Sequence, residues 1–193
     1  MLKSKDMRKA YEVYTKTVSE AGWPISWKVS TFLISLMNKV KLNRILDLGS
    51  GWSSYLLRLG GAEVWSIDTD AEWLEKTRGF LTQFNQLNGH FGLLEDFEFP
   101  TEQTYDLVLI DSKPGRKRYE MFTSIKRCCK GIVVFDDWNN DKIREPALKA
   151  FSDWKIQNLE RETKDRWGRF IAVAYRGKEY HVVMGDLLIK GDL

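Results

Sequence analysis

The chain has 193 residues, of which 43% are hydrophobic and 30% charged, and its formal net charge is +3. This composition is ordinary for one soluble globular domain, and the mild charge gives no argument for nucleic-acid or membrane binding. The two cysteines are the neighbours Cys128 and Cys129, expected within a helix, so neither a disulfide framework nor a cysteine-based zinc site is expected.

The N-terminal part of the chain carries helical periodicity. Residues 6–21 repeat apolar side chains at spacings of three and four, which is typical of an amphipathic helix, and a second such pattern covers 29–40 after a break at GWPIS (22–26). There is no apolar signal core here, and no run in the chain approaches the ~18 apolar residues of a membrane span. We therefore expect a cytoplasmic protein without a membrane partner.

From residue 45 the pattern changes to short apolar runs that alternate with helical segments. The runs are ILDL (45–48), EVWSI (63–67), HFGLL (90–94), DLVLI (106–110) and GIVVF (131–135). Runs of this length and composition indicate strands buried on both faces, as in a parallel sheet. Thr69 and Glu72 fit a capping box before the helix that follows the second run, and His90 is expected to begin the third strand.

The C-terminal part contains IQNLERE (156–162) and RFIAVAYR (169–176), which TKDRWG separates, as in an antiparallel hairpin. The tail KEYHVVMGDLLIK (178–190) is compatible with one more strand. We predict one α/β domain over residues 1–193. It comprises a helical extension (1–40), a doubly wound core (41–176) and a tail (177–193).

The first predicted strand ends in a Gly-Ser-Gly turn, within RILDLGSGWSS (44–54). In an open parallel sheet, ligands bind at the carboxyl ends of the strands. A dinucleotide fingerprint requires a third glycine at position 54, where this chain has Ser54, so an NAD-linked oxidoreductase is the weaker alternative. Asp47, just before the turn, would repel a phosphate and attract an ammonium group.

Further carboxylates follow the next two strands. Asp68 lies 21 residues after Asp47, where a carboxylate can accept hydrogen bonds from the ribose hydroxyls of NAD or S-adenosylmethionine. Glu95 and Asp96 follow the third strand, placed to meet an adenine edge. The alternative interpretation is that these side chains cap helices or face solvent.

ILDLGSG followed by VWSIDTD resembles motifs I and II of the class I S-adenosylmethionine-dependent methyltransferases, and YDLVLIDS (105–112) resembles their fourth-strand motif. The resemblance extends over about residues 25–175. It implies a Rossmann-like sheet of seven strands, mostly parallel, with the last strand antiparallel. It also implies a set of residues for S-adenosylmethionine. These are Asp47, Gly49, Ser50 and Gly51 for the methionine portion, Asp68 and Thr69 for the ribose, Asp96 or Phe97 for the adenine, and Asp111 near the methyl group.

Three carboxylates follow two neighbouring strands: Asp111 after the fourth, and Asp136 and Asp137 after the fifth. Oxygen ligands of this kind suit Mg²⁺ or another divalent cation. The layout resembles that of the catechol and caffeoyl-coenzyme-A O-methyltransferases, which implies that the three bind a metal and that Asp111 acts in catalysis. The alternative is that Asp136 and Asp137 cap the next helix.

That family commonly has a lysine three residues after the first metal ligand, where this chain has Pro114, with Lys113 one residue earlier. Lys113 is our candidate general base, and a solvated loop lysine is the alternative. KPGRKRY (113–119) and the cations Lys126, Arg127 and Lys130 form a basic cluster. Its simplest interpretation is a solvated surface, but it leaves an RNA methyltransferase or nucleic-acid-binding module as the alternative function.

We therefore predict an S-adenosylmethionine-dependent methyltransferase that acts on an oxygen of a small molecule or sugar, with metal assistance left open. We expect a monomer or homodimer. Four tryptophans, Trp23, Trp27, Trp52 and Trp138, are expected near the cofactor, with Trp52 as a candidate lid.

Overall fold

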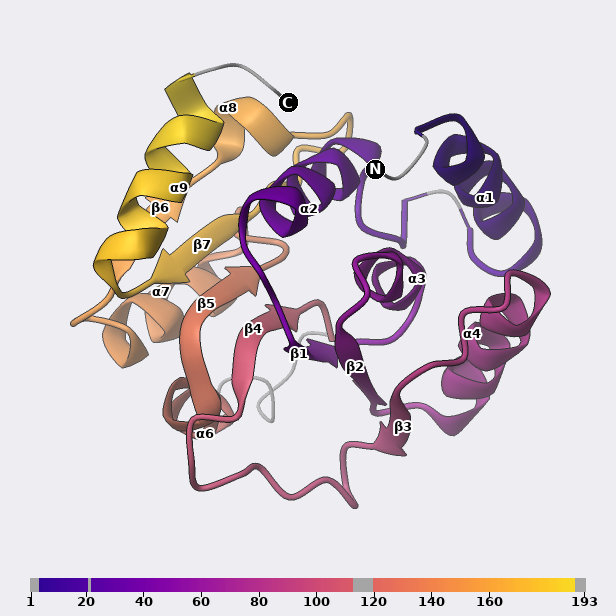
Figure 1. Cartoon of the computed structure of the whole chain (residues 1–193), viewed down its shortest axis with the longest axis horizontal. Helices are drawn as coiled ribbons and strands as arrows, with labels where there is room; N and C mark the ends of the chain where they lie inside the picture. Colours follow the sequence, from indigo (N-terminus) through magenta and orange to yellow (C-terminus); the bar gives the residue numbers. More distant parts are fainter. Residues whose placement is uncertain (1–3, 21, 113–119, 190–193) are drawn as a thin grey trace.

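The computed structural model describes residues 4–20, 22–112 and 120–189, and its centre is a seven-stranded sheet (Figure 1). The strand order is β3-β2-β1-β4-β5-β7-β6, in which β1 to β5 are parallel and β7 runs antiparallel to both of its neighbours. The strands are β1 (Arg44–Leu48), β2 (Glu63–Asp68), β3 (His90–Leu93), β4 (Tyr105–Ile110), β5 (Cys129–Phe135), β6 (Lys155–Asn158) and β7 (Ala172–Tyr175). The predicted Rossmann-like sheet is confirmed.

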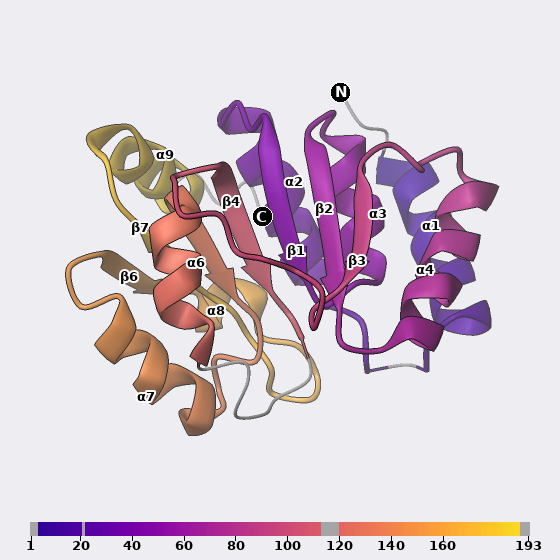
Figure 2. The same ribbon diagram turned by 90° about the horizontal axis from the view of Figure 1, so that it is seen from below.

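Helices cover both faces of this sheet (Figure 2). On one face lie α1 (Ser4–Thr17), α2 (Trp27–Lys39), α3 (Trp52–Leu59), α4 (Ala71–Gln83) and α9 (Lys178–Ile189), and on the other lie α6 (Phe122–Cys128) and α7 (Asp141–Ala150). Strand residues alternate between the two cores, so Ile45 packs with the first group of helices and its neighbour Leu46 with the second. Burial on both faces explains the continuous apolar runs of the sequence.

The winding direction reverses at β1, which pairs with β2 on one side and with β4 on the other. The chain leaves β1 and β4 toward opposite faces, which opens a crevice at the carboxyl ends of these strands. The Gly-Ser-Gly turn and Asp111 both lie at this position. The fold thus brings the predicted site residues to one edge of the sheet.

The tail forms a helix, so the prediction of another strand there is wrong. Its Tyr180, Val183, Met184 and Leu187 pack on the first core at spacings of three and four, while Val182 is exposed. Gly131 of β5 makes room for this helix, because a Cβ there would lie 2.2 Å from the ring of Tyr180. In the part of the chain that the structure describes, no helix combines the length and the apolar character needed to cross a membrane.

Three smaller predictions concern the ends of elements. Helix α4 is capped by Asp70, which accepts hydrogen bonds from Glu72 and Trp73, and so Thr69 is not the cap. Cys129 begins β5 and is not helical, although both cysteines are free as expected. His90 does begin β3, and the predicted hairpin is formed by β6 and β7 with the short helix α8 (Glu160–Thr163) between them.

Candidate active site

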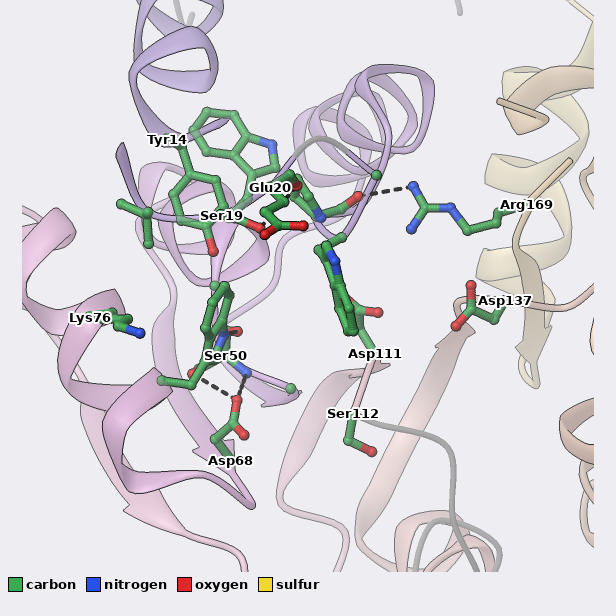
Figure 3. A pocket seen from close by; sticks show the side chains of 18 residues that line it. Tyr14, Ser19, Glu20, Ser50, Asp68, Lys76, Asp111, Ser112, Asp137 and Arg169 are labelled. Carbon is green, nitrogen blue, oxygen red and sulfur yellow. Dashed lines mark hydrogen bonds between the residues drawn. The ribbon is translucent and has the colours of Figure 1, made fainter. Parts of the chain in front are cut away.

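A cavity of about 670 Å³ opens at the carboxyl ends of the parallel strands (Figure 3). Its described walls come from the strand ends with the start of α3, from α1 and the segment that joins it to α2, from α4, and from the loop before β7. The residues that line it include Tyr14, Glu20, Trp23, Pro24, Gly49, Ser50, Gly51, Trp52, Asp68, Trp73, Lys76, Asp111, Ser112, Asp137 and Arg169.

The glycine turn is held by its own hydrogen bonds. The backbone N–H of Gly49 donates to Ile67 O (2.9 Å), that of Ser50 to Asp68 Oδ2 (2.7 Å), and that of Gly51 to Ser54 Oγ (3.1 Å). All three N–H groups of the turn are therefore engaged within the protein. A phosphate would need them as donors, so the geometry argues against a pyrophosphate cradle.

Both glycines also allow a close approach by other parts of the chain. A Cβ on Gly49, which has a φ of 103°, would lie 2.4 Å from the carbonyl carbon of Asp111. A Cβ on Gly51, with a φ of 154°, would lie 2.8 Å from the hydroxyl of Tyr14. Gly49 thus lets the ends of β1 and β4 meet, and Gly51 lets helix α1 reach the turn.

Asp68 lies on the cavity wall at the end of β2, where the sequence places it. Its Oδ2 accepts hydrogen bonds from the N–H and Oγ of Ser50 at 2.7 and 2.9 Å, and its Oδ1 accepts from the N–H of Asp70. Thr69 and Asp96 are exposed, and Phe97 packs against Trp65. These last three residues lie outside the described walls of the cavity, and their contact with a cofactor stays a prediction.

Asp47 is fully buried behind the turn and does not lie on the described walls of the cavity. Its Oδ2 accepts hydrogen bonds from Ser54 Oγ (2.5 Å) and Ser66 Oγ (3.2 Å), and the buried Arg58 also donates to Ser66. Burial raises the pKa of Asp47 to about 6, although the serine hydroxyls and the charge of Arg58 act in the opposite direction. Its role toward an ammonium group stays a prediction.

This raised pKa predicts a pH-dependent difference between the wild type and Asp47→Asn. The folded state keeps the proton of Asp47 up to about pH 6, whereas the unfolded chain releases it near pH 4. The stability that Asp47 contributes should therefore fall as the pH rises from 4 to 6. The free energy of unfolding is measured in urea for both proteins. The value for Asp47→Asn minus the value for the wild type should increase by up to about 3 kcal/mol between pH 4 and pH 6. A constant difference from pH 4 to 7 would contradict the prediction.

Asp111, Asp136 and Asp137 come together at the ends of β4 and β5. One carboxylate oxygen from each lies within 4.8 Å of the others. Asp136 is buried, and this burial together with the charge of Asp137 raises its pKa to about 6. Asp137 has a φ of 55°, a left-handed conformation that aspartate tolerates better than most residues. An all-oxygen donor set of this kind fits a hard divalent cation.

The alternative interpretation of Asp136 and Asp137 as a helix cap is wrong. Helix α7 begins after Asn140, whose side chain accepts a hydrogen bond from the N–H of Lys142 at 3.0 Å. The two aspartates precede this cap and are not needed to start the helix.

No protein-family model matches the chain, and no curated protein matches it in sequence. Solved structures match it closely in fold. A tRNA methyltransferase from Aquifex aeolicus is 16% identical, with a TM-score of 0.69 over 88% of this chain and 76% of its own. An O-methyltransferase from Streptomyces achromogenes, solved with S-adenosylmethionine, is 16% identical. Its TM-score is 0.66, and the match covers 91% of this chain and 92% of that enzyme. This is the class I methyltransferase fold. An O-methyltransferase from Bacillus cereus, solved with S-adenosylhomocysteine, is 15% identical and has a TM-score of 0.61 over 91% and 93%.

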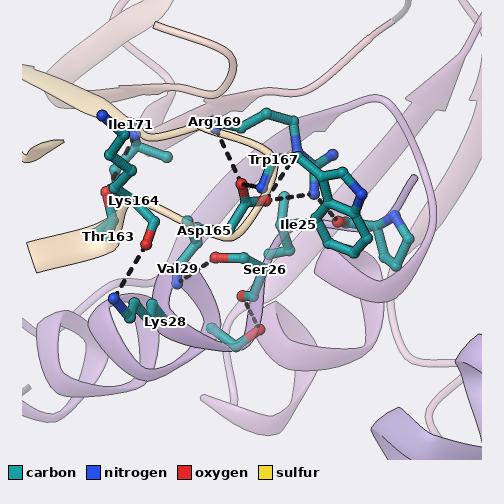
Figure 4. Close-up of polar contacts among 12 residues, drawn as sticks. Ile25, Ser26, Lys28, Val29, Thr163, Lys164, Asp165, Trp167, Arg169 and Ile171 are labelled. Atoms are coloured by element: carbon teal, nitrogen blue, oxygen red, sulfur yellow. Dashed lines mark hydrogen bonds and ion pairs between the residues drawn. The ribbon is translucent and has the colours of Figure 1, made fainter. Parts of the chain in front are cut away.

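In this methyltransferase fold, the wall opposite Asp68 contains a residue that the sequence did not point to, Arg169. Its guanidinium donates to Asp165 Oδ2 (2.9 Å) and to Pro24 O (3.2 Å), which ties the loop before β7 to the segment before α2 (Figure 4). The ring of Trp167 lies beside Gly22, where a Cβ would be 3.2 Å away. Because the joined segments are 145 residues apart, no local motif could have predicted this contact.

Two other wall residues that the sequence did not single out come from α4. Trp73 Nε1 donates to Ser50 O at 2.6 Å and so fixes the indole against the glycine turn. Lys76 pairs with Glu72 one turn earlier on the same helix. Both follow the cap at Asp70, so the capping pattern could have placed them near the end of β2.

The four tryptophans have different environments. Trp23 is 65% exposed and lies at the cavity, as expected. Trp52 also lies at the cavity, as expected, but it is buried, stacks on Tyr55 and donates to Ser30 Oγ, so its predicted role as a lid is wrong. Trp138 is also buried and packs against Phe135, while Trp27 packs against Tyr11, outside the described walls.

The basic cluster is only partly described. Lys113 and the other residues of 113–119 lie outside the described residues, so the proposed general base has no described position. Lys126 pairs with Asp153, and Lys130 pairs with Asp106 at 2.9 Å. These two ion pairs lower the positive charge available for a nucleic acid.

Proposed function

We propose that this protein transfers a methyl group from S-adenosylmethionine to a hydroxyl of a small molecule or sugar. The observation that carries the proposal is the charge of the cavity at the switch point of the sheet. Its described walls hold four carboxylates, those of Glu20, Asp68, Asp111 and Asp137, and two cations, Lys76 and Arg169, which are both paired with acidic side chains. Such walls suit a cofactor with a sulfonium and an ammonium group and no phosphate.

The residues on the cofactor side fit this ligand. Asp68 is fixed by Ser50 and Asp70 and lies at the end of β2, where its carboxylate can accept hydrogen bonds from ribose hydroxyls. The indole of Trp73 supports the turn from the side of α4. When bound, S-adenosylmethionine supplies an electrophilic methyl group. The contribution of the protein is then to orient that group toward the acceptor and to exclude water.

On the acceptor side, we propose that Asp111, Asp136 and Asp137 hold Mg²⁺ or another divalent cation. A bound cation would lower the pKa of an acceptor hydroxyl. The three carboxylates would hold it at the strand ends, and Trp23, Pro24 and Arg169 form another part of the cavity wall. Lys113 remains the proposed general base.

Two features favour a small acceptor over RNA. The described walls are acidic, and two of the cations from the basic cluster are used in ion pairs. Two of the compared structures are O-methyltransferases, whereas the tRNA methyltransferase from Aquifex aeolicus supports the alternative. A cytoplasmic location and a monomeric or homodimeric state stay predictions from the sequence.

The proposal predicts that the protein binds S-adenosylhomocysteine, the product of methyl transfer. Isothermal titration calorimetry should give one site per chain with a dissociation constant on the order of micromolar. NAD, titrated in parallel, should give no heat of binding, because the turn has no N–H group left for its pyrophosphate. Binding of NAD without binding of S-adenosylhomocysteine would overturn the proposal.

A further inference from the structure

Tyr14 of helix α1 reaches the glycine turn from the far side of the cavity (Figure 3). Its ring is buried between Phe80 and Trp52, at centroid distances of 4.9 and 6.0 Å. Its hydroxyl stands over Gly51, 2.8 Å from the position that a Cβ would take. Helix α1 thus sends one polar group to the place where the turn meets the cavity.

The hydroxyl of Tyr14 has a hydrogen to donate. The backbone N–H of Trp52 acts on this hydroxyl to lower its pKa, and no hydrogen bond from the hydroxyl to an acceptor is formed among the residues that the structure describes. Burial raises the pKa of Tyr14, and the nearby negative charges of Asp111, Asp47 and Asp68 act in the same direction. The group therefore stays a neutral donor throughout the physiological pH range.

Several other donors around the cavity already have acceptors. Ser50 Oγ donates to Asp68, Trp73 Nε1 to Ser50 O, and Trp52 Nε1 to Ser30 Oγ. The guanidinium of Arg169 is held by Asp165 and Pro24. A ligand with a negatively charged group would need a donor in these acidic surroundings, and the hydroxyl of Tyr14 offers one beside the turn.

We propose that the hydroxyl of Tyr14 donates a hydrogen bond to the carboxylate of the methionine portion of the cofactor. This inference rests on the proposed function, because S-adenosylmethionine carries this one carboxylate. It makes helix α1 a part of the cofactor site in addition to its part in the core. Tyr14 acts here as a positioning residue that fixes the methionine end of the ligand.

The test combines two ligands with two proteins. S-adenosylhomocysteine and its analogue without the carboxylate are titrated by calorimetry into the wild type and Tyr14→Phe. Tyr14→Phe should bind S-adenosylhomocysteine at least tenfold more weakly, as expected for a hydrogen bond to a charged group, and should bind the analogue within twofold of the wild type. Tyr11→Phe is the matched control, since the hydroxyl of Tyr11 lies on the same helix and donates to Ile25 O. It should bind both ligands like the wild type.

An equal loss of affinity for both ligands in Tyr14→Phe would show a structural role and overturn the inference, as would no loss for either. Thermal unfolding of each variant checks that it is folded. A wild type that binds neither ligand would refute the proposed function itself, and the inference with it. A wild type that binds both, with no selective effect of Tyr14→Phe, would refute the inference alone.

Discussion

Asp68→Asn is expected to weaken the binding of S-adenosylhomocysteine by about 100-fold. The carboxylate of Asp68 accepts hydrogen bonds from the N–H and hydroxyl of Ser50 and lies on the cavity wall, so one charged group both fixes the turn and faces the cavity. Asparagine keeps the size of the side chain but replaces one acceptor with a donor. The proposed hydrogen bonds from the two ribose hydroxyls to the carboxylate of Asp68 are charge-assisted, and weakening both accounts for the expected loss of affinity of about 100-fold. Calorimetry with S-adenosylhomocysteine measures it.

Asp106→Asn is the matched control for this prediction. Asp106 is a buried carboxylate that accepts two backbone N–H groups, from Asn43 and Arg44, at 2.7 and 2.9 Å. It lies at the opposite end of the sheet, at the start of β4. Asp106→Asn should lower the free energy of unfolding but leave the affinity for S-adenosylhomocysteine within twofold of the wild-type value. Equal losses of affinity in both variants would mean that Asp68 acts through stability alone.

The second large effect concerns the proposed metal. Asp136→Asn and Asp137→Asn should each weaken Mn²⁺ binding at least tenfold, because each removes a charged oxygen from a cluster of three. Methyl transfer to a hydroxyl acceptor should fall by about 100-fold. The binding of Mn²⁺ alone is measured by electron paramagnetic resonance, which separates loss of the ion from loss of activity.

Asp141→Asn provides the control for the metal experiment. Asp141 is an exposed carboxylate in the first turn of α7, four residues after Asp137 and outside the cluster. The Asp141→Asn variant should bind Mn²⁺ with the same affinity as the wild type. Formation of product at an undiminished rate in excess chelator would contradict the metal site but leave the methyl-transfer proposal intact.

The strands and part of the site were predictable because each depends on local sequence. A buried parallel strand needs a continuous apolar run, and the carboxyl ends of such strands meet at one edge, so Asp68, Asp111 and Asp137 could be expected at one place. The tail was not predictable in this way. Its sequence was compatible with a strand, and the helix is stabilised by contacts with a core that is distant in the sequence, where the ring of Tyr180 packs over Gly131.

Other parts of the site depend on how distant segments dock. Tyr14 occupies an apolar position of a helical repeat, so the sequence predicts a core residue, and only the docking of α1 brings its hydroxyl to Gly51. Trp52 follows the turn directly but is drawn into the aromatic core by Tyr55 and Ser30. Arg169 lies in a hairpin loop without a motif; its partner Asp165 belongs to the same loop, whereas Pro24 lies 145 residues earlier in the chain.

The contact between Arg169 and Pro24 has a consequence for the order in which the protein is built during translation. The turn, Asp68 and Trp73 are all synthesised early and can come together once the first strands pair. The wall formed by Pro24 and Arg169 can be completed only after Arg169 is synthesised, 145 residues later than Pro24. Under the proposed function, a nascent chain would therefore form the surface for the methyl donor before it completes the wall proposed for the acceptor.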